Sequence, residues 1–124
     1  MPKILVIDDD SSMCQILEMY LTEEGNEVVT VGTGTDGLTK YRESQPDLVI
    51  LDIRLPDIDG FTMLKNLKKE NENVKVIMIT AFHEIDSRSK ANEASAFAYI
   101  KKPVDMFELD RAIKSAFNTR ERGK

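Results

Sequence analysis

Short hydrophobic runs alternate along the chain with stretches whose apolar residues recur at helical spacing. The runs occupy residues 4–7, 28–31, 48–51, 74–79 and 98–100. The third run is apolar without interruption, as is typical of a strand covered on both faces. A strand followed by a helix roughly every 25 residues favours right-handed crossovers. We therefore expect an α/β fold in which helices cover both faces of a parallel sheet.

The first and last helices have the clearest patterns. The first is predicted by five residues at spacing i, i+3, i+4, i+7 and i+8, namely Met13, Ile16, Leu17, Tyr20 and Leu21. Asp10 or Ser11 is its expected N-cap, and Gly25 follows where a helix end favours a left-handed residue. The last helix opens with Asp105 and Glu108 in a capping-box pattern. Its apolar stripe consists of Leu109, Ala112, Ile113, Ala116 and Phe117.

The three middle helices are less sharply marked. Leu38 and Tyr41 indicate a short, weak helix before Pro46. A third helix directs Phe61, Leu64 and Leu67 inward. The fourth, around residues 86–94, is the least defined because its apolar face is mostly alanine.

The composition narrows the class of protein. With 124 residues the chain has room for one domain, and 41% hydrophobic with 31% charged residues is ordinary for a globular protein. The net charge of −5 argues against direct nucleic-acid binding. No apolar run reaches membrane-spanning length, and the acidic start is unlike a signal peptide, so we expect a cytoplasmic location. Cys14 is the single cysteine, which excludes an internal disulfide.

Four polar residues or clusters follow the predicted strands closely. Asp8-Asp9-Asp10 ends the first run, Asp52 the third and Thr80 the fourth, while Lys102 lies two residues past the fifth. In an open parallel sheet, all of these lie at the carboxyl edge, where ligands bind. Clustered carboxylates repel one another and attract a cation, and an all-oxygen acidic site suits Mg²⁺. Helix capping accounts for Asp10 or Ser11 and leaves Asp8 and Asp9 for this chemistry.

Five motifs in order give the chain a family resemblance. They are ILVIDDD at 4–10, PDLVILD at 46–52, LPDIDG at 55–60, ITA at 79–81 and Lys102-Pro103. Together they resemble the signature set of response-regulator receiver domains of two-component signalling, over nearly the whole chain. The resemblance implies a flavodoxin-like doubly wound (βα)5 fold with strand order 2-1-3-4-5. We expect the receiver domain to span residues 1–118, followed by a polar tail or linker at 119–124.

The resemblance also implies a phosphoacceptor site. Asp52 would take a phosphoryl group from a sensor histidine kinase or a histidine phosphotransfer protein. Mg²⁺ would be bound directly by Asp9, largely through water by Asp8, and by Asp52 and the backbone carbonyl of Arg54. The domain would assist its own phosphorylation and dephosphorylation without being an enzyme for other substrates.

Further residues of the family pattern concern the phosphorylated state. Lys102, the Thr80 hydroxyl and the Ala81 N–H would contact phosphoryl oxygens. Thr80 would then be drawn toward the phosphoryl group, and Tyr99 would rotate into the space that it leaves. The surface made by the fourth helix, the fifth strand and the fifth helix would carry this signal to an output domain or partner.

The chain departs from the family pattern, or varies within it, at several positions. Ser95 stands where glycine is usual before Ala96. Arg54 and Phe82 occupy variable positions, each two residues past a site residue, where they would crowd the hydrolytic water and prolong the phosphorylated state. His83 is interpreted as a surface loop residue, because the relay histidine belongs to the partner.

Two other functions of related chemistry are disfavoured. An aspartyl-phosphate hydrolase of the haloacid-dehalogenase type carries an acid two residues after its nucleophile, where this chain has Arg54. A flavin-binding domain would need a loop of N–H donors after the first strand, whereas residues 8–10 would repel a phosphate. The sequence leaves open whether the chain is a stand-alone relay carrier or the receiver of a longer regulator. We expect a monomer or a weak phosphorylation-dependent dimer.

Overall fold

Each of the five hydrophobic runs forms a strand of one parallel sheet. The computed structural model describes residues 2–80 and 96–122, with side chains up to residue 118. The strand order is β2-β1-β3-β4-β5, with every neighbouring pair parallel, which confirms the predicted fold. The strands are β1 (Lys3–Ile7), β2 (Glu27–Val31), β3 (Leu48–Asp52), β4 (Val76–Thr80) and β5 (Ala98–Lys101).

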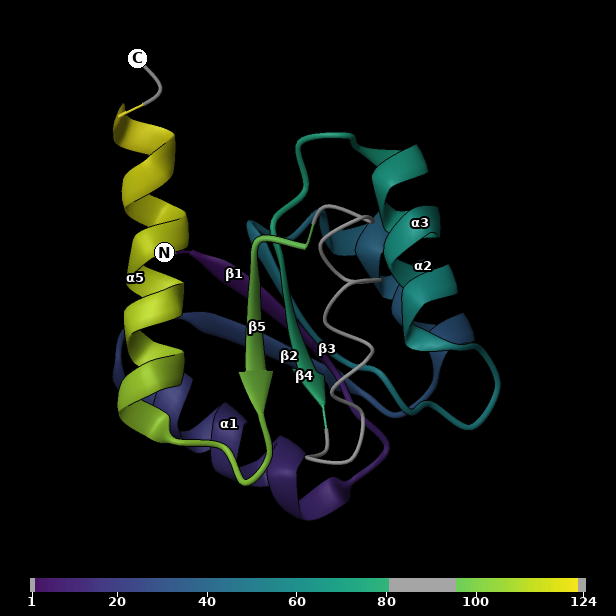
Figure 1. The fold of residues 1–124 in the computed structure, drawn as a ribbon, viewed down its shortest axis with the longest axis horizontal. Coiled ribbons are helices and arrows are strands. Elements are labelled where there is room, and N and C mark those ends of the chain that lie inside the picture. The colour runs from purple at the N-terminus through teal and green to yellow at the C-terminus, as the bar shows by residue number, and fades with distance from the viewer. Residues whose placement is uncertain (1, 81–95, 123–124) are drawn as a thin grey trace.

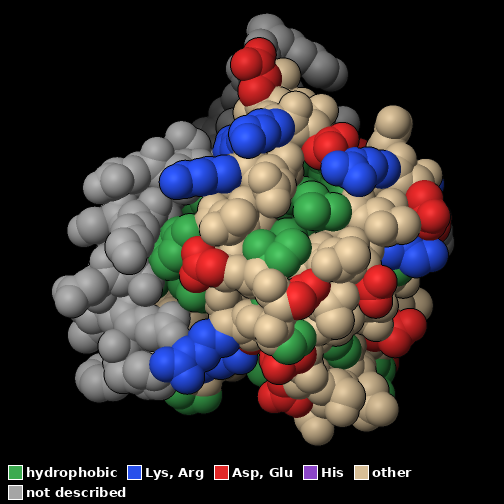
Figure 2. Space-filling view, turned by 90° about the vertical axis from the view of Figure 1, so that its right-hand side faces the viewer, with side chains coloured by type: hydrophobic (Ala, Val, Ile, Leu, Met, Phe, Trp, Pro, Cys, Tyr) green, Lys and Arg blue, Asp and Glu red, His purple; other side chains and the backbone are tan. Residues whose placement is uncertain are grey.

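Helices cover both faces of this sheet (Figure 1). Those described are α1 (Ser11–Glu23), α2 (Gly34–Ser44), α3 (Gly60–Glu70) and α5 (Met106–Arg122). In Figure 1 α1 and α5 lie on one side of the sheet, and α2 and α3 lie on the other. Figure 2 views the molecule from the side of α2 and α3, where acidic and basic side chains are interspersed on the surface. The helix predicted around residues 86–94 lies outside the described residues, as do Ala81, Phe82, His83 and Ser95.

The alternation of side chains along the strands divides the core into two layers. Leu5, Val49 and Met78 belong to the layer under α2 and α3, where they pack with Met63, Leu64 and Leu67. The neighbouring strand residues face α1 and α5 and form the second layer; it contains Ile4, Val6, Ile50, Ile77, Leu17, Leu21, Leu109 and Ile113. β3 is buried along its whole length, as its unbroken apolar run predicts.

Aspartates begin three of the helices. Asp10 caps α1 by accepting the N–H groups of Ser12 and Met13, which selects it over Ser11 as the N-cap. Asp59 caps α3, and Asp105 caps α5 by accepting the N–H groups of Phe107 and Glu108. Gly25 follows α1 with a φ of +94°, as its position predicts.

Two details of the helices differ from the sequence-based expectation. Ile16 was predicted to face the core but is 52% exposed, because it lies about 100° around α1 from the buried line of Leu17 and Leu21. α2 is longer than its apolar pattern indicates, because two of its three buried residues are glycines. α5 ends at Arg122.

Within residues 2–80 and 96–122, no helix combines the length and the hydropathy that a membrane span requires.

Candidate functional site

The polar residues predicted from the strand ends gather at one edge of the sheet. Asp8 follows β1, Asp52 ends β3, and Thr80 ends β4. Asp52 is aligned with Ile79 in the β3–β4 pair, so Thr80 lies one residue beyond it along the edge. Asp8, Asp52 and Thr80 are 2%, 4% and 1% exposed, whereas Asp9 is exposed. Burying polar groups costs free energy of folding, and three of the four buried polar residues among those described lie at this edge.

Three carboxylates form the acidic part of the site. Asp8, Asp9 and Asp52 each offer an oxygen, and these oxygens lie within 4.8 Å of one another. One oxygen of Asp8, Oδ1, accepts the Asp10 N–H at 2.9 Å. The other, Oδ2, is buried without a hydrogen-bond partner among the described residues. A buried oxygen of this kind, beside two further carboxylates, fits a hard cation such as Mg²⁺.

The pKa of Asp8 also reflects its burial beside other carboxylates. Burial raises the pKa of Asp8 from 3.8 to about 6; the Asp10 N–H opposes this shift, and the negative charge of Asp52 adds to it. The ammonium of Lys102 partly offsets the effect. A bound cation would favour the charged form of Asp8 and remove this penalty.

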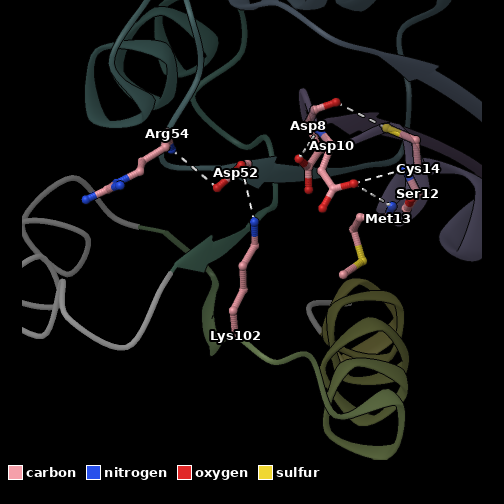
Figure 3. Close-up of polar contacts among 8 residues, drawn as sticks. All are labelled: Asp8, Asp10, Ser12, Met13, Cys14, Asp52, Arg54 and Lys102. Atoms are coloured by element: carbon pink, nitrogen blue, oxygen red, sulfur yellow. Dashed lines mark hydrogen bonds and ion pairs between the residues drawn. The ribbon is translucent and has the colours of Figure 1, made fainter.

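Asp52 has polar partners on two sides (Figure 3). Its Oδ1 accepts the Arg54 N–H at 3.3 Å, and its Oδ2 pairs with Lys102 Nζ at 3.4 Å. The Lys102 side chain is 29% exposed and reaches across from the segment after β5. Its own backbone N–H donates to the Thr80 carbonyl at 2.6 Å, just before a cis Lys102–Pro103 bond. Lys102 is thereby anchored beside the end of β4.

The loop between β3 and α3 closes tightly over this edge. The Ile53 N–H donates to the Ile79 carbonyl at 3.0 Å, and the Gly60 N–H donates to the Ile53 carbonyl at 2.9 Å. A Cβ at Gly60 would lie 2.5 Å from the Ile53 Cα, so glycine is required there. The loop therefore holds Arg54 directly beside Asp52.

The structure brings most of the predicted site residues together and leaves some apart. Asp8, Asp9, Asp52, Lys102 and the Arg54 backbone form one group, with Thr80 at its border. Tyr99 is half-buried on β5 and packs against the layer under α2 and α3. Ala81 and Phe82 lie outside the described residues.

Two contacts at this site were not predicted. The Cys14 thiol donates to the Asp8 carbonyl at 3.2 Å, and Asp57 binds the first turn of α2. The helical position of Cys14 was readable from the sequence. The contact between Asp57 and α2 could not be predicted from local sequence, because the two segments are far apart in the chain and meet only in the folded protein.

The family of the chain follows from comparison with known proteins. The model of the response regulator receiver domain family matches residues 4–114, so the chain belongs to this family. It is a phosphoacceptor signalling domain of two-component systems. Receiver domains generally use Mg²⁺ at an acidic site and interact with histidine kinases or phosphotransfer proteins; in this chain the three clustered aspartates offer such a site.

Individual relatives agree with this assignment. The sporulation initiation phosphotransferase F of Bacillus subtilis is 34% identical over 112 residues, covering 90% of each chain. The probable transcriptional regulator ycf27 of Pyropia yezoensis is 41% identical over 91% of this chain and 46% of its own length. A receiver domain protein from Clostridium thermocellum superposes over both full chains with a TM-score of 0.94 and 35% identity. The chain spans about half the length of several transcriptional regulators that it matches.

Proposed function

We propose that Asp52 accepts the phosphoryl group of a phosphohistidine on a sensor histidine kinase or histidine phosphotransfer protein. The observation that carries this proposal is the setting of Asp52. It is buried at the end of the central strand β3, within 4.8 Å of two further carboxylates and 3.4 Å from the Lys102 ammonium. This combination provides a nucleophile together with charges that receive an anionic group.

The metal would be held by the acidic group. Asp9 would bind Mg²⁺ directly and Asp8 largely through water, with Asp52 and the Arg54 carbonyl completing the protein ligands. The unpartnered Asp8 Oδ2 supports this assignment. When bound, Mg²⁺ neutralises charge on the carboxylates and on the phosphoryl oxygens.

Each residue of the site would then have a separate role in phosphoryl transfer. A carboxylate oxygen of Asp52 attacks phosphorus, the P–N bond to the donor imidazole breaks, and the electron pair leaves with the imidazole nitrogen. Lys102 exchanges its contact with Asp52 for one with a phosphoryl oxygen. The Thr80 hydroxyl and the Ala81 N–H donate to the remaining oxygens. The domain assists these steps on itself only.

The signal would pass to the surface that contains β5 and α5. Movement of Thr80 toward the phosphoryl group would allow Tyr99 to turn inward and change this surface together with the fourth helix. We propose residues 1–118 as the phosphoacceptor unit, acting in the cytoplasm on an output domain or partner protein. The similarity to transcriptional regulators supports the choice of an output domain. Direct nucleic-acid contact by this acidic unit is not part of the proposal.

Arg54 and Phe82 would set the lifetime of the phosphorylated state. The Arg54 side chain is exposed, and its backbone lies beside Asp52. A long cation there, together with an aromatic ring two residues past Thr80, would restrict the water that hydrolyses the acyl phosphate. Both would act on the access and positioning of water rather than on bond making.

Mass spectrometry tests the proposal. The full chain is incubated with Mg²⁺ and acetyl phosphate, and its intact mass is recorded. We expect a gain of one phosphoryl group, lost in Asp52→Asn and retained in Asp36→Asn, which removes an exposed charge of α2. A phosphoryl gain that persists in Asp52→Asn would overturn the assignment.

A further inference from the structure

The first turn of α2 is bound by a carboxylate from a different part of the chain. Asp57, in the loop between β3 and α3, accepts the Gly34 N–H at 2.8 Å through Oδ1. Its Oδ2 accepts the Thr35 N–H at 3.0 Å and the Thr35 hydroxyl at 2.7 Å. Helix N-termini leave such N–H groups without partners inside the helix. Asp57 satisfies two of them from outside, while Thr33 satisfies the Asp36 N–H from within.

Charge complementarity makes this contact specific for a carboxylate. The hydrogen bonds from the Thr35 hydroxyl, the Thr35 N–H and the Gly34 N–H lower the pKa of Asp57 to about 2. The partial positive charge at a helix N-terminus favours the same ionised form. An asparagine at position 57 keeps one acceptor but turns an NH₂ group toward donors, so it cannot reproduce the contact.

An apolar contact holds the same loop against the same turn. A Cβ at Gly34 would lie 3.0 Å from the Ile58 Cβ and 3.0 Å from the Met63 Sδ. Glycine thus allows Ile58, the neighbour of Asp57, to approach the helix backbone closely. The loop is fixed to α2 by a charged contact and a packing contact at adjacent residues.

The other end of this loop belongs to the phosphoacceptor site. Arg54 lies three residues before Asp57, and its N–H donates to Asp52 at 3.3 Å. Ile53 and Gly60 close the base of the loop. Between these two ends, Asp57 attaches the loop to a separate helix, so it restrains where the Arg54 backbone lies relative to the carboxylates.

We propose that Asp57 is a positioning residue that couples the first turn of α2 to the Mg²⁺-binding edge through the loop carrying Arg54. This inference rests on the proposed function, in which the Arg54 carbonyl is a metal ligand. Asp57 itself does not touch the metal or the phosphoryl group. Coupling of binding free energies is reciprocal: if the Asp57 contact favours Mg²⁺ binding, then Mg²⁺ must strengthen the contact by the same factor.

The test follows amide signals by NMR during a Mg²⁺ titration of the full chain at fixed pH and ionic strength. We expect Asp57→Asn to bind Mg²⁺ about three- to tenfold more weakly than the wild type. The matched control is Asp36→Asn, which removes a charge from the same helix turn and leaves the contact intact; its affinity should change less than about twofold. Thr35→Val removes only the hydrogen bond from the hydroxyl and should give an intermediate loss of Mg²⁺ affinity. Because both substitutions act on one contact, the loss in the double variant should be smaller than the sum of the two single losses.

Hydrogen exchange distinguishes coupling from a purely structural contact, because Mg²⁺ would not change amide exchange at a contact that is not coupled to the metal site. In the wild type, Mg²⁺ should slow exchange of the Gly34 and Thr35 amides, and the change should disappear in Asp57→Asn. Equal Mg²⁺ affinities in wild type, Asp57→Asn and Thr35→Val would overturn the coupling and leave the proposed function standing. If the wild type gives no Mg²⁺ response, the metal site itself is wrong and the coupling falls with it. Should Asp57→Asn not fold, Thr35→Val decides the question alone.

Discussion

Polar groups at the two edges of the sheet are compensated to different degrees. At the amino edge the Asp47 carboxylate accepts the Lys3 N–H at 2.8 Å, and the Asp47 N–H donates to the Lys3 carbonyl at 2.8 Å. The Lys3 ammonium donates to the Ser44 carbonyl. At the carboxyl edge Asp8 keeps an oxygen without a described partner, close to two further carboxylates. The polar groups at the amino edge are paired with one another, whereas the carboxyl edge keeps negative charge that Lys102 only partly compensates.

The difference indicates where stability has been exchanged for function. Sequences are generally consistent across propensity, packing and polar satisfaction, with exceptions at functional sites. The amino edge follows this consistency. The carboxyl edge breaks it at Asp8, whose pKa is raised to about 6 by burial and by the charge of Asp52. A bound cation would relieve this imbalance, so the comparison leads to experiments on both edges.

Loss of a metal ligand should have the largest effect. Asp9 is the exposed member of the acidic group and the proposed direct ligand, so Asp9→Asn tests this role with little change in packing. We expect Mg²⁺ affinity to fall about a hundredfold, measured by amide shifts during titration. Asp47→Asn, at the opposite edge, serves as the control and should bind normally. If Asp9→Asn binds Mg²⁺ as tightly as the wild type, the metal site lies elsewhere.

Neutralising Asp8 should stabilise the metal-free protein. The folded-state pKa of Asp8 lies above its unfolded value, so its ionisation destabilises the fold. The free energy of unfolding of the wild type should therefore fall as pH rises from about 4 through about 6. Asp8→Asn should lack this loss and gain up to about 3 kcal/mol at pH 8, on the order of a hundredfold in the unfolding equilibrium.

Urea denaturation with EDTA across this pH range measures the Asp8 effect. Adding Mg²⁺ should reverse the order of stability, because only the wild type keeps the full ligand set. A pH profile of the variant that parallels the wild type would show that Asp8 is not the strained group.

Arg54 and Phe82 should tune the lifetime of the phosphorylated state. We expect Arg54→Asn and Phe82→Ala each to accelerate phosphoryl loss, by up to about tenfold, since each admits water more freely. Loss of the phosphorylated mass is followed at fixed Mg²⁺ in both variants and in the double variant. Unchanged or slower loss in all three would place the control of lifetime elsewhere.

The smallest effect is expected at the amino edge. Asp47→Ala leaves the Lys3 N–H without its carboxylate acceptor and should reduce the free energy of unfolding by about 1 kcal/mol. Asp47→Asn retains an acceptor and should recover much of this loss. Neither variant should alter Mg²⁺ affinity. A change in Mg²⁺ affinity on either substitution would remove the functional distinction between the two edges.

Much of the fold was predictable from local patterns. The unbroken apolar run predicted that β3 is buried, and the apolar stripe predicted which face of α5 packs on the sheet. The failures have physical causes. Spacing alone could not separate Ile16 from the buried line of α1, and α2 gave little apolar signal because glycines occupy its buried positions.

The site was predictable to the extent that strand ends determine it. Parallel strands place their carboxyl ends together, so Asp8, Asp52 and Thr80 could be assigned to one edge from the sequence. The Asp57 contact could not, because it depends on how the loop folds across to α2. Local sequence identifies which residues reach an edge, whereas contacts between loops and distant helices require the tertiary structure.

The most direct measurement locates the phosphoryl group on the chain. The protein is phosphorylated with acetyl phosphate in the presence of Mg²⁺, reduced with borohydride, which converts an aspartyl phosphate to homoserine, and mapped by peptide mass spectrometry. We predict homoserine at position 52 alone, and none when EDTA replaces Mg²⁺. Homoserine at position 8 or 9, or equal labelling without Mg²⁺, would contradict the assignment of Asp52 as the metal-assisted phosphoacceptor.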